Sequence, residues 1–475
     1  MRRFGGVRII LDRHNDKEEK IMKKEFIWGA ASASYQAEGA WNEDGKSPSI
    51  WDKFAHDKKC FREQTADVAC DHYHRYEEDV ALMRELRLGS YRFSVSWARI
   101  FPRDGFVNEE GISFYNRLID RLIENNIEPM LTLYHWDMPL WVYERGGFLS
   151  RETAEKFAEY VTVIAERFGD RVKNFITINE PQCVLHGGLY SDALAPGIKL
   201  SLKELLAAGH NLLLCHGVAV KILREKVKGA KIGISSCGWV TCPSDDSPEA
   251  EQKAYENFFK VWKEQPMNCM SVLTDPVYLG DYPEEYYEYF KNELPEITAD
   301  DLALISAPLD FIGQNIYSGF YMDKNGEIAP FKDGSSQNDM GWDDIPESVY
   351  YGLKFLYKRY KKPIIITENG TAQNDRVCLD GKVHDAYRID HTARYLSEMK
   401  KAVDEGIPVN GYYHWAFTDN FEWKCGFGKR FGLVFIDYDT QKRIKKDSFY
   451  FYKKVIETNG EILGSPQKLF QIKES

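Results

Sequence analysis

The sequence has few of the local patterns that mark several common classes of protein. Its nine cysteines are odd in number and include no C-x-x-C pair, so they indicate neither a disulfide framework nor a zinc site. No apolar run is long enough to span a membrane or to form the core of a signal peptide. No stretch rich in proline and serine divides the chain. We therefore expect a single domain with reduced thiols in the cytoplasm.

The chain also has too little positive charge for a protein that binds nucleic acid or a membrane surface. Its formal net charge is −11 at pH 7, and phosphate backbones and anionic lipids repel such a net anion. The basic run KRIKKD at 442–447 is expected to be a solvated turn. The 475 residues, 43% of them hydrophobic, can bury a large core. A neutral small molecule is the expected partner, without a cofactor or a metal ion.

Eight short β-rich runs alternate with helical stretches along the chain. This alternation favours parallel βα units over an antiparallel sheet. The predicted strands are 26–32, 90–97, 128–136, 172–180, 231–237, 311–317, 363–370 and 410–417. Between them apolar residues recur with a 3.6-residue period, for example at 115–126, 154–169 and 387–406. We predict an α/β fold, a single (β/α)8 TIM barrel over residues 22–475, with long βα loops after the fifth, sixth and eighth strands.

Two of the predicted strands end on an acid. The run ITINEP carries Glu180, and the run IIITENG carries Glu368. The active site of a (β/α)8 barrel lies where its strands end, so polar residues there are candidates for chemistry. Amides, acids and indoles at such a site suit a sugar, because they pair with hydroxyls and stack on its C–H surface. The other residues at or near these ends are Gln36, Arg92, His135, Trp136, Asn179, Asn315, Tyr317, Trp415, Glu422 and Trp423.

Longer motifs around these residues resemble glycoside hydrolase family 1, the β-glucosidase family of retaining exo-glycosidases. The resemblance runs from about residue 26 to residue 450. It includes FIWGAASASYQAEGA, YRFSVSWARIFP, LYHWDMP, TINEP, TENG and HWAFTDNFEW. It implies that Glu180 is the acid/base and Glu368 the nucleophile. It further implies that the terminal sugar is held by Gln36, His135, Asn179, Trp415, Glu422 and Trp423, that Arg92, Asn315 and Tyr317 tune the two acids, and that Trp342 lines the leaving-group side.

The two acids need different protonation states. A retaining glycosidase holds its carboxyl groups roughly 5 to 5.5 Å apart, one attacking the anomeric carbon and one protonating the departing oxygen. Arg92 is expected to lower the pKa of Glu368 and keep it ionised. Burial near apolar walls is expected to keep Glu180 protonated until the glycosyl ester forms. Asn179 is expected to bind the sugar 2-hydroxyl.

Three alternatives remain at this point. A non-catalytic sugar-binding barrel is disfavoured by the intact pair of acids. A metal-dependent hydrolase would use His72 and His74, but this pair opens a helical stretch and is better explained by packing. A 6-phospho-β-glucosidase is disfavoured by Glu422, whose carboxylate would repel phosphate, and is kept open by Lys429 and Arg430. β-Galactosides and β-fucosides are possible further substrates. Oligomeric state and aglycone are not predicted.

The first 21 residues are expected to lie outside the barrel. They are charged and poor in core residues, so they cannot offset the entropy of ordering. Lys-Glu-Glu at 17–19 can be encoded by a purine-rich ribosome-binding sequence. We therefore expect translation to start at Met22, with residues 1–21 as a non-native or disordered extension.

Overall fold

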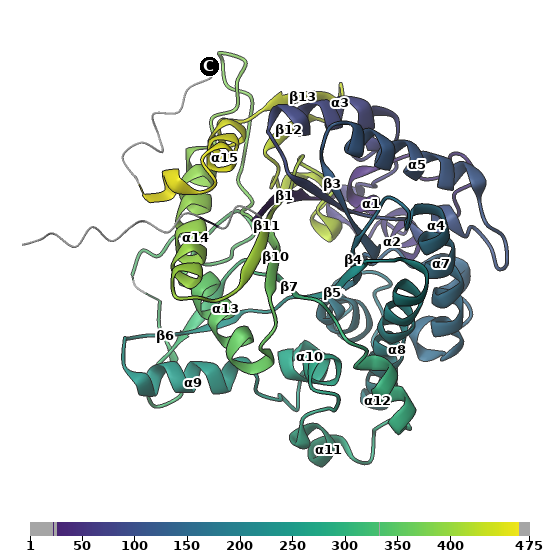
Figure 1. The fold of residues 1–475 in the computed structure, drawn as a ribbon, viewed down its shortest axis with the longest axis vertical. Coiled ribbons are helices and arrows are strands. Elements are labelled where there is room, and N and C mark those ends of the chain that lie inside the picture. The colour runs from purple at the N-terminus through teal and green to yellow at the C-terminus, as the bar shows by residue number, and fades with distance from the viewer. Residues whose placement is uncertain (1–21, 23–25, 332, 465–475) are drawn as a thin grey trace, which may run out of the picture.

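Eight parallel strands close into a barrel at the centre of the molecule (Figure 1). The computed structural model describes residue 22 and residues 26–331 and 333–464. Each strand neighbours the next one of the barrel in chain order, and β1 closes against β11. The strands are β1 (Ile27–Ala31), β2 (Ser90–Ser94), β3 (Glu128–Tyr134), β4 (Asn174–Asn179), β5 (Lys231–Ser236), β7 (Ile312–Asn315), β10 (Ile364–Asn369) and β11 (Val409–Trp415). All eight predicted strands are confirmed, and the fold is the predicted TIM barrel.

Helices surround the barrel and cover its outer face (Figure 1). In α7, for example, Phe157, Tyr160 and Ile164 are buried at intervals of three and four residues, the period of one helix face. The longer helices are α3 (His72–Glu85), α5 (Glu109–Glu124), α7 (Glu152–Phe168), α8 (Leu202–Lys226), α9 (Pro248–Phe258), α10 (Met270–Tyr278), α13 (Glu347–Tyr360), α14 (Ala386–Asp404) and α15 (Asp447–Glu457). The three helices predicted from periodicity correspond to α5, α7 and α14.

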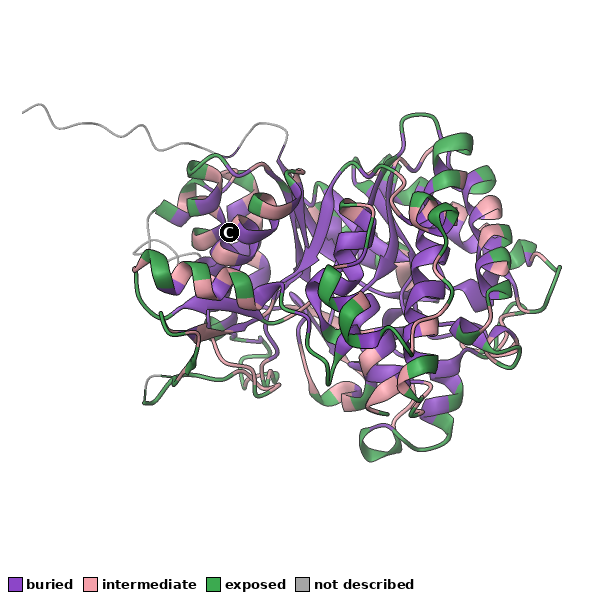
Figure 2. Cartoon of the chain, turned by 90° about the horizontal axis from the view of Figure 1, so that it is seen from below, coloured by how far each residue is buried: buried purple, intermediate pink, exposed green. Residues whose placement is uncertain are grey.

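The barrel strands are buried along almost their whole length (Figure 2). Strand β10, IIITEN, is buried at every position, and so is β4, NFITIN. A parallel strand that has side chains inside the barrel and helices outside it has no solvent face, which is why these runs are continuously apolar and not alternating. Polar residues therefore concentrate at the strand ends.

Long segments extend the barrel where its strands end. The stretch between β5 and β7 holds α9, α10, α11 (Glu284–Phe290) and α12 (Ala299–Ile305). A small sheet joins β6 (Val240–Pro243), β8 (Gly319–Met322) and β9 (Ile328–Ala329), and a hairpin joins β12 (Val434–Asp437) to β13 (Lys442–Lys445). These follow the fifth, sixth and eighth strands, as predicted. The segment after β1 is also long and holds α1 (Ser34–Ala37) and α2 (Ile50–His56).

Some local details differ from the predictions. The run 442–447 is not a solvated turn, because it forms β13 and buries Lys446 in ion pairs with Asp375 and Asp419. The strand predicted over 90–97 ends at Ser94, and α4 (Trp97–Ile100) begins where the chain turns away from the barrel. Helix α8 is apolar and long enough to cross a membrane, but 78% of its most apolar stretch is buried inside the protein, so its composition is that of a core helix. The extension predicted over 1–21 lies outside the described residues.

Candidate functional site

A pocket of about 280 Å³ opens where the barrel strands end. Its size is near the lower end of the range for small-ligand sites. The predicted site residues that line it are His135, Trp136, Asn179, Glu180, Asn315, Tyr317, Trp342, Glu368, Trp415, Glu422 and Trp423. The remaining two predicted residues do not line the pocket themselves but contact residues that do. Gln36 donates to Glu422, and Arg92 donates to Glu368. The structure therefore brings together all the residues that the sequence singled out.

Glu368, the last residue but one of β10, is held by two donors. Arg92 Nη1 donates to its Oε1 at 2.6 Å, and the Tyr317 hydroxyl donates to its Oε2 at 2.7 Å. Arg92 comes from β2 across the barrel, and its side chain is fully buried. Because both carboxyl oxygens accept a hydrogen bond, the arrangement fits the ionised form of Glu368.

Glu180 follows β4 directly and is linked to Glu368 through amides. Asn315 Nδ2, on β7, donates to Glu180 Oε1 at 2.7 Å and to Asn179 Oδ1 at 3.2 Å. Arg92 Nη2 donates to the same Asn179 oxygen at 2.6 Å. The chain Glu368–Arg92–Asn179–Asn315–Glu180 therefore fixes the two acids in one cluster of hydrogen bonds.

The pKa of Glu368 departs from the prediction. Burial raises this pKa to about 7, although Arg92 lowers it, and the neighbouring Glu180 charge adds to the rise. Arg92 lowers the pKa of Glu368, as predicted, but the net shift is upward, because taking the carboxyl out of water outweighs the ion pair. The two donors on Glu368 oppose this rise, because both stabilise its ionised form.

The side of the pocket formed by Gln36 and Glu422 is built for hydroxyl groups. Gln36 Nε2 donates to Glu422 Oε2 at 3.3 Å. Within the described residues, Gln36 Oε1 and His135 Nδ1 are buried without a hydrogen-bond partner. Burial lowers the pKa of His135 well below its ordinary value, so the ring is neutral, and its Nε2 accepts from Asn179. Buried polar atoms are nearly always paired, so both atoms are available to a ligand.

Glu422 is a third acid in the same pocket. Burial raises its pKa to about 8, and the charges of Glu368 and Glu180 add to the rise. The Gln36 hydrogen bond lowers it only in part. The raised pKa favours the protonated form of Glu422 near neutral pH, in which it can both donate to and accept from a hydroxyl. The expectation of a full carboxylate charge at this position is not met.

Indole rings form the apolar wall of the pocket. Trp136 stacks on Trp423 with ring centroids 4.5 Å apart, and Trp415 stacks on His135 at 6.0 Å. Trp342 meets Tyr317 at 5.3 Å and the exposed Trp239 at 5.8 Å, so it lies on the outer side of the pocket. Flat apolar faces beside fixed polar atoms are the surroundings that a sugar ring requires.

Three of the site residues have a left-handed backbone. The φ angles are 47° at Glu180, 76° at Trp136 and 49° at Trp423. Each costs of order 1–3 kcal/mol in a residue other than glycine, and such conformations cluster at functional sites because the surrounding structure holds them there. Nothing in the local sequence indicates these conformations.

None of the predicted site residues lies on the fifth strand. In the structure Ser235, on β5, donates to Asn315 Oδ1 at 3.0 Å, and Thr367 donates to the same oxygen at 2.7 Å. Cys237, directly after β5, lines the pocket together with Cys183. The rule that polar residues at strand ends form the site would have found Ser235 and Cys237. Other lining residues that it missed are Trp239, Asn268, Met340, Lys424, Cys425 and Phe431.

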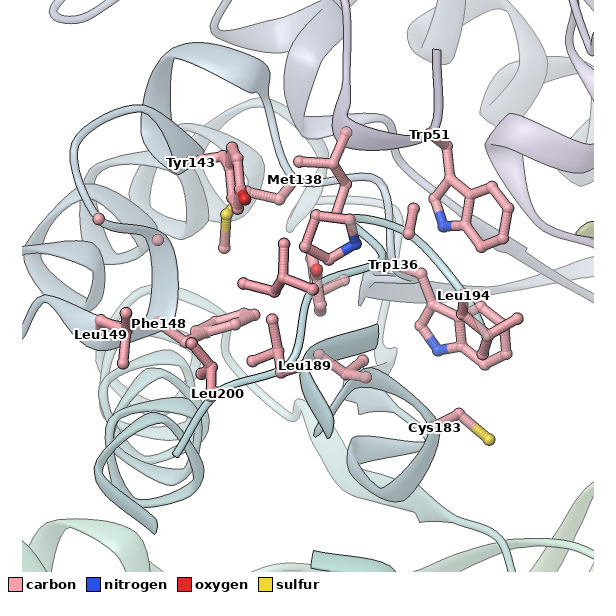
Figure 3. A pocket seen from close by; sticks show the side chains of 18 of the residues that line it. Trp51, Trp136, Met138, Tyr143, Phe148, Leu149, Cys183, Leu189, Leu194 and Leu200 are labelled. Carbon is pink, nitrogen blue, oxygen red and sulfur yellow. The ribbon is translucent and has the colours of Figure 1, made fainter. Parts of the chain in front are cut away.

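A second cavity of about 340 Å³ adjoins the pocket and is mainly apolar (Figure 3). Trp136, Cys183 and Leu194 line both cavities. Figure 3 shows these three side chains together at one side of the apolar cavity. Phe148, Leu189 and Leu200 enclose it elsewhere.

The histidines of the metal alternative take other partners. His72 Nδ1 pairs with Asp79 at 2.7 Å, and His74 Nδ1 pairs with Asp71 at 2.6 Å. Both lie at the start of α3, and neither lines the pocket. These contacts support the interpretation of the pair as structural.

Comparison with known proteins agrees with this geometry. The model of Glycosyl hydrolase family 1 matches residues 18–461. Beta-glucosidase A of Thermotoga maritima is 44% identical over 444 residues, 92% of this chain and 97% of that protein. A solved structure of the Thermotoga maritima β-glucosidase with glucoimidazole is similar at a TM-score of 0.85 and 42% identity, over 93% of this chain and 99% of that one. An aryl-phospho-β-D-glucosidase of Bacillus subtilis is 38% identical over 480 residues, 93% of this chain and 98% of that protein.

Proposed function

The chain belongs to glycosyl hydrolase family 1, and from this premise we propose that it is an exo-acting β-glucosidase that works with retention of configuration. The observation that carries the proposal is the pair of acids in one sugar-sized pocket. Glu368 accepts from Arg92 and Tyr317, whereas Glu180 accepts from a neutral amide. One carboxyl is thus prepared to attack and the other to give up a proton.

In the first step the glycosidic bond breaks. A Glu368 oxygen attacks the anomeric carbon and forms a glycosyl ester, while Glu180 gives its proton to the departing oxygen, which leaves as an alcohol. Asn179 lies between Arg92 and Asn315, where its Nδ2 can serve the sugar 2-hydroxyl. A hydrogen bond to this hydroxyl strengthens as positive charge develops at the anomeric carbon.

In the second step water releases the sugar. Formation of the ester removes the negative charge of Glu368, so the ionised Glu180 no longer has a charged neighbour and can act as a base. It takes a proton from water, whose oxygen attacks the anomeric carbon from the side that the alcohol has left. Glu368 departs as a carboxylate that Arg92 and Tyr317 stabilise. Two inversions give a product of the original configuration.

The terminal sugar is a glucosyl residue without a phosphate. Gln36 and Glu422 offer acceptors and donors to its outer hydroxyls. The two cations that kept the phosphate alternative open have other partners, because Lys429 contacts Asp339, and Arg430 donates to Asp419 at 2.7 Å. A β-galactoside differs from a glucoside in the configuration of the 4-hydroxyl, and a β-D-fucoside also lacks the 6-hydroxyl; both are further candidate substrates. The nine cysteines are all free, which supports a cytoplasmic location.

A panel of aryl β-glycosides tests the proposal. We expect the highest kcat/KM for the glucoside, measurable values for the galactoside and fucoside, and a much lower value for the 6-phosphoglucoside. Equal or better turnover of the phosphorylated sugar would replace the proposal with a 6-phospho-β-glucosidase. If no member of the panel is hydrolysed, the function that remains is that of a non-catalytic sugar-binding barrel.

A further inference from the structure

Two thiols and the proposed acid/base of the pocket form a cluster. Cys183 opens the π-helical turn η3 (Cys183–Tyr190), which follows Glu180, and Cys237 follows β5. Because β4 and β5 are neighbours in the barrel, their ends bring the two sulfurs to 3.6 Å. One carboxyl oxygen of Glu180 and the two sulfurs all lie within 4.8 Å of one another. The sequence, with no C-x-x-C pair, gives no local sign of this cluster.

The spacing of the three atoms suits a tetrahedral metal ion. Zinc binds thiolate sulfur at about 2.3 Å and carboxylate oxygen at about 2.0–2.2 Å. At tetrahedral angles two such sulfurs stand about 3.8 Å apart, and a sulfur and an oxygen stand about 3.6 Å apart. The sulfurs at 3.6 Å are already close to this separation, and each sulfur–oxygen distance, at most 4.8 Å, needs to shorten by at most about 1.2 Å.

The cluster is open to solutes through the sugar pocket. Glu180, Cys183 and Cys237 all line this pocket, and both cysteines are partly exposed. In Figure 3 the sulfur of Cys183 points away from the apolar cavity that Leu189 and Leu200 enclose. A metal ion that enters the pocket can therefore reach all three ligand atoms and keep a water molecule at its fourth position.

A buried amide borders the two thiols. Gln182 Oε1 accepts from the backbone N–H of Cys237 and lies 3.9 Å from its sulfur. Nε2 of the same amide is buried and has no hydrogen-bond partner within the part of the chain that the structure describes. The hydrogen bond from Cys237 N–H fixes the Gln182 side chain beside the thiols. A residue that holds a metal ligand in place in this way contributes to the affinity of the site.

We propose that Glu180, Cys183 and Cys237 form a binding site for a thiophilic divalent cation, with Zn²⁺ as the fitting ion, and that the bound ion inhibits hydrolysis. Binding converts both thiols to thiolates and releases their protons. The ion also occupies the lone pair of Glu180 that would carry the catalytic proton. Inhibition therefore rests on the proposed role of Glu180, whereas binding of the ion does not.

Cobalt absorption measures binding without activity. Reduced protein, freed of reductant, is titrated with Co²⁺, which gives a thiolate charge-transfer band and the visible bands of a tetrahedral site. We expect one Co²⁺ per chain, displaced by Zn²⁺. In Cys183→Ser and in Cys237→Ser the affinity should fall about tenfold or more, and the charge-transfer band should weaken. Glu180→Gln should also bind Co²⁺ more weakly.

Two matched controls carry the same chemical change elsewhere. Cys425→Ser removes another thiol that lines the pocket, and Cys378→Ser removes a partly exposed thiol that does not line it. Both should bind Co²⁺ like the unaltered chain. Absence of the charge-transfer band in the unaltered chain, or its loss in Cys425→Ser with retention in Cys183→Ser, would overturn the site.

Activity then tests the inhibitory effect separately. Zn²⁺ should inhibit hydrolysis of an aryl glucoside by the unaltered chain, and EDTA should restore it. The inhibition constant should rise about tenfold or more in each of the two cysteine variants, measured against its own metal-free activity. Binding of Co²⁺ and Zn²⁺ without inhibition would support the site and contradict the role of Glu180 as acid/base.

Discussion

Two of the buried arginine–carboxylate pairs of the protein have different surroundings. Arg92 donates to Glu368 at 2.6 Å, and Arg443 donates to Asp79 at 2.9 Å, and these four side chains are at most 4% exposed. Burial would raise the pKa of Asp79, but hydrogen bonds from His72 and Arg443 lower it below its ordinary value. The pKa of Glu368 is instead raised to about 7, because burial outweighs Arg92.

The difference lies in what else shares each site. Asp79 has two donors around it and joins α3 to β13. Arg92 faces a cavity into which Glu180 and Glu422 bring two further acids. A buried carboxylate whose charge is balanced by donors, such as Asp79, joins two elements of the fold. Acids that crowd one cavity, such as Glu368 and Glu422, have raised pKa values and can exchange protons near neutral pH, which suits catalysis. Substitutions in the two pairs should therefore separate stability from catalysis.

The largest effect is expected for Glu368→Gln. Hydrolysis should fall about 10⁴-fold or more, because the variant loses the proposed nucleophile. The unfolding temperature should change little, because the amide oxygen of glutamine can still accept the hydrogen bond from Arg92. Turnover of an aryl glucoside and thermal unfolding measure the two quantities. Glu128→Gln is the control. Glu128 is the first residue of β3, at the end of the barrel opposite the pocket, and its substitution should change neither turnover nor the unfolding temperature. Residual turnover within a hundredfold of the unaltered chain would contradict the assignment.

Arg443→Met should have the opposite profile. It leaves Asp79 buried without its cation, and breaking a buried pair in this way costs about 3–5 kcal/mol of unfolding free energy. The kcat/KM of the folded protein should remain nearly unchanged. Denaturant unfolding and active-site-normalised kinetics test both statements. Lys442→Met, at an exposed position of the same strand, should leave the unfolding transition in place. An unchanged transition in Arg443→Met would show that the pair does not stabilise the fold.

Tyr317→Phe should have the smallest effect of the three. A hydrogen bond to a charged group contributes about 1.5–3 kcal/mol, so kcat/KM should fall by roughly tenfold to a hundredfold. The hydroxyl lowers the pKa of Glu368, and its removal raises that pKa. The acid limb of the kcat/KM profile should therefore move to higher pH. Tyr321→Phe, whose hydroxyl contacts Glu347 outside the pocket, is the control. An unshifted limb would contradict the role of Tyr317.

The sequence predicted the barrel and most of its site, because both depend on short-range signals. Most strands contain a short apolar run, and Glu180 and Glu368 stand where two such runs end. The carboxyl ends of the parallel strands lie on one side of the barrel, so residues at the ends of separate strands become neighbours in space. The same rule explains why Ser235 and Cys237 could have been found.

Other features depend on contacts that no local pattern reports. The sequence predicts a solvated turn for the run that holds Arg443 and Lys446. Both side chains are buried because they form ion pairs with Asp79, Asp375 and Asp419, which are distant in the sequence. The raised pKa of Glu368 is a balance between burial and one arginine, and it requires the depth of the pocket. The left-handed backbone of Trp136 and Glu180 is likewise imposed by the surrounding structure.

The most direct test of the central claim is the product that azide forms with Glu180→Ala. Without the acid/base, this variant should still form the glycosyl ester of Glu368 from a substrate with a good leaving group, and azide should then take the place of the activated water. The account predicts faster turnover in azide and a β-glucosyl azide, identified by its proton coupling in NMR spectra. An α-glucosyl azide, or no rescue while Glu368→Gln retains activity, would contradict the assignment of the two acids.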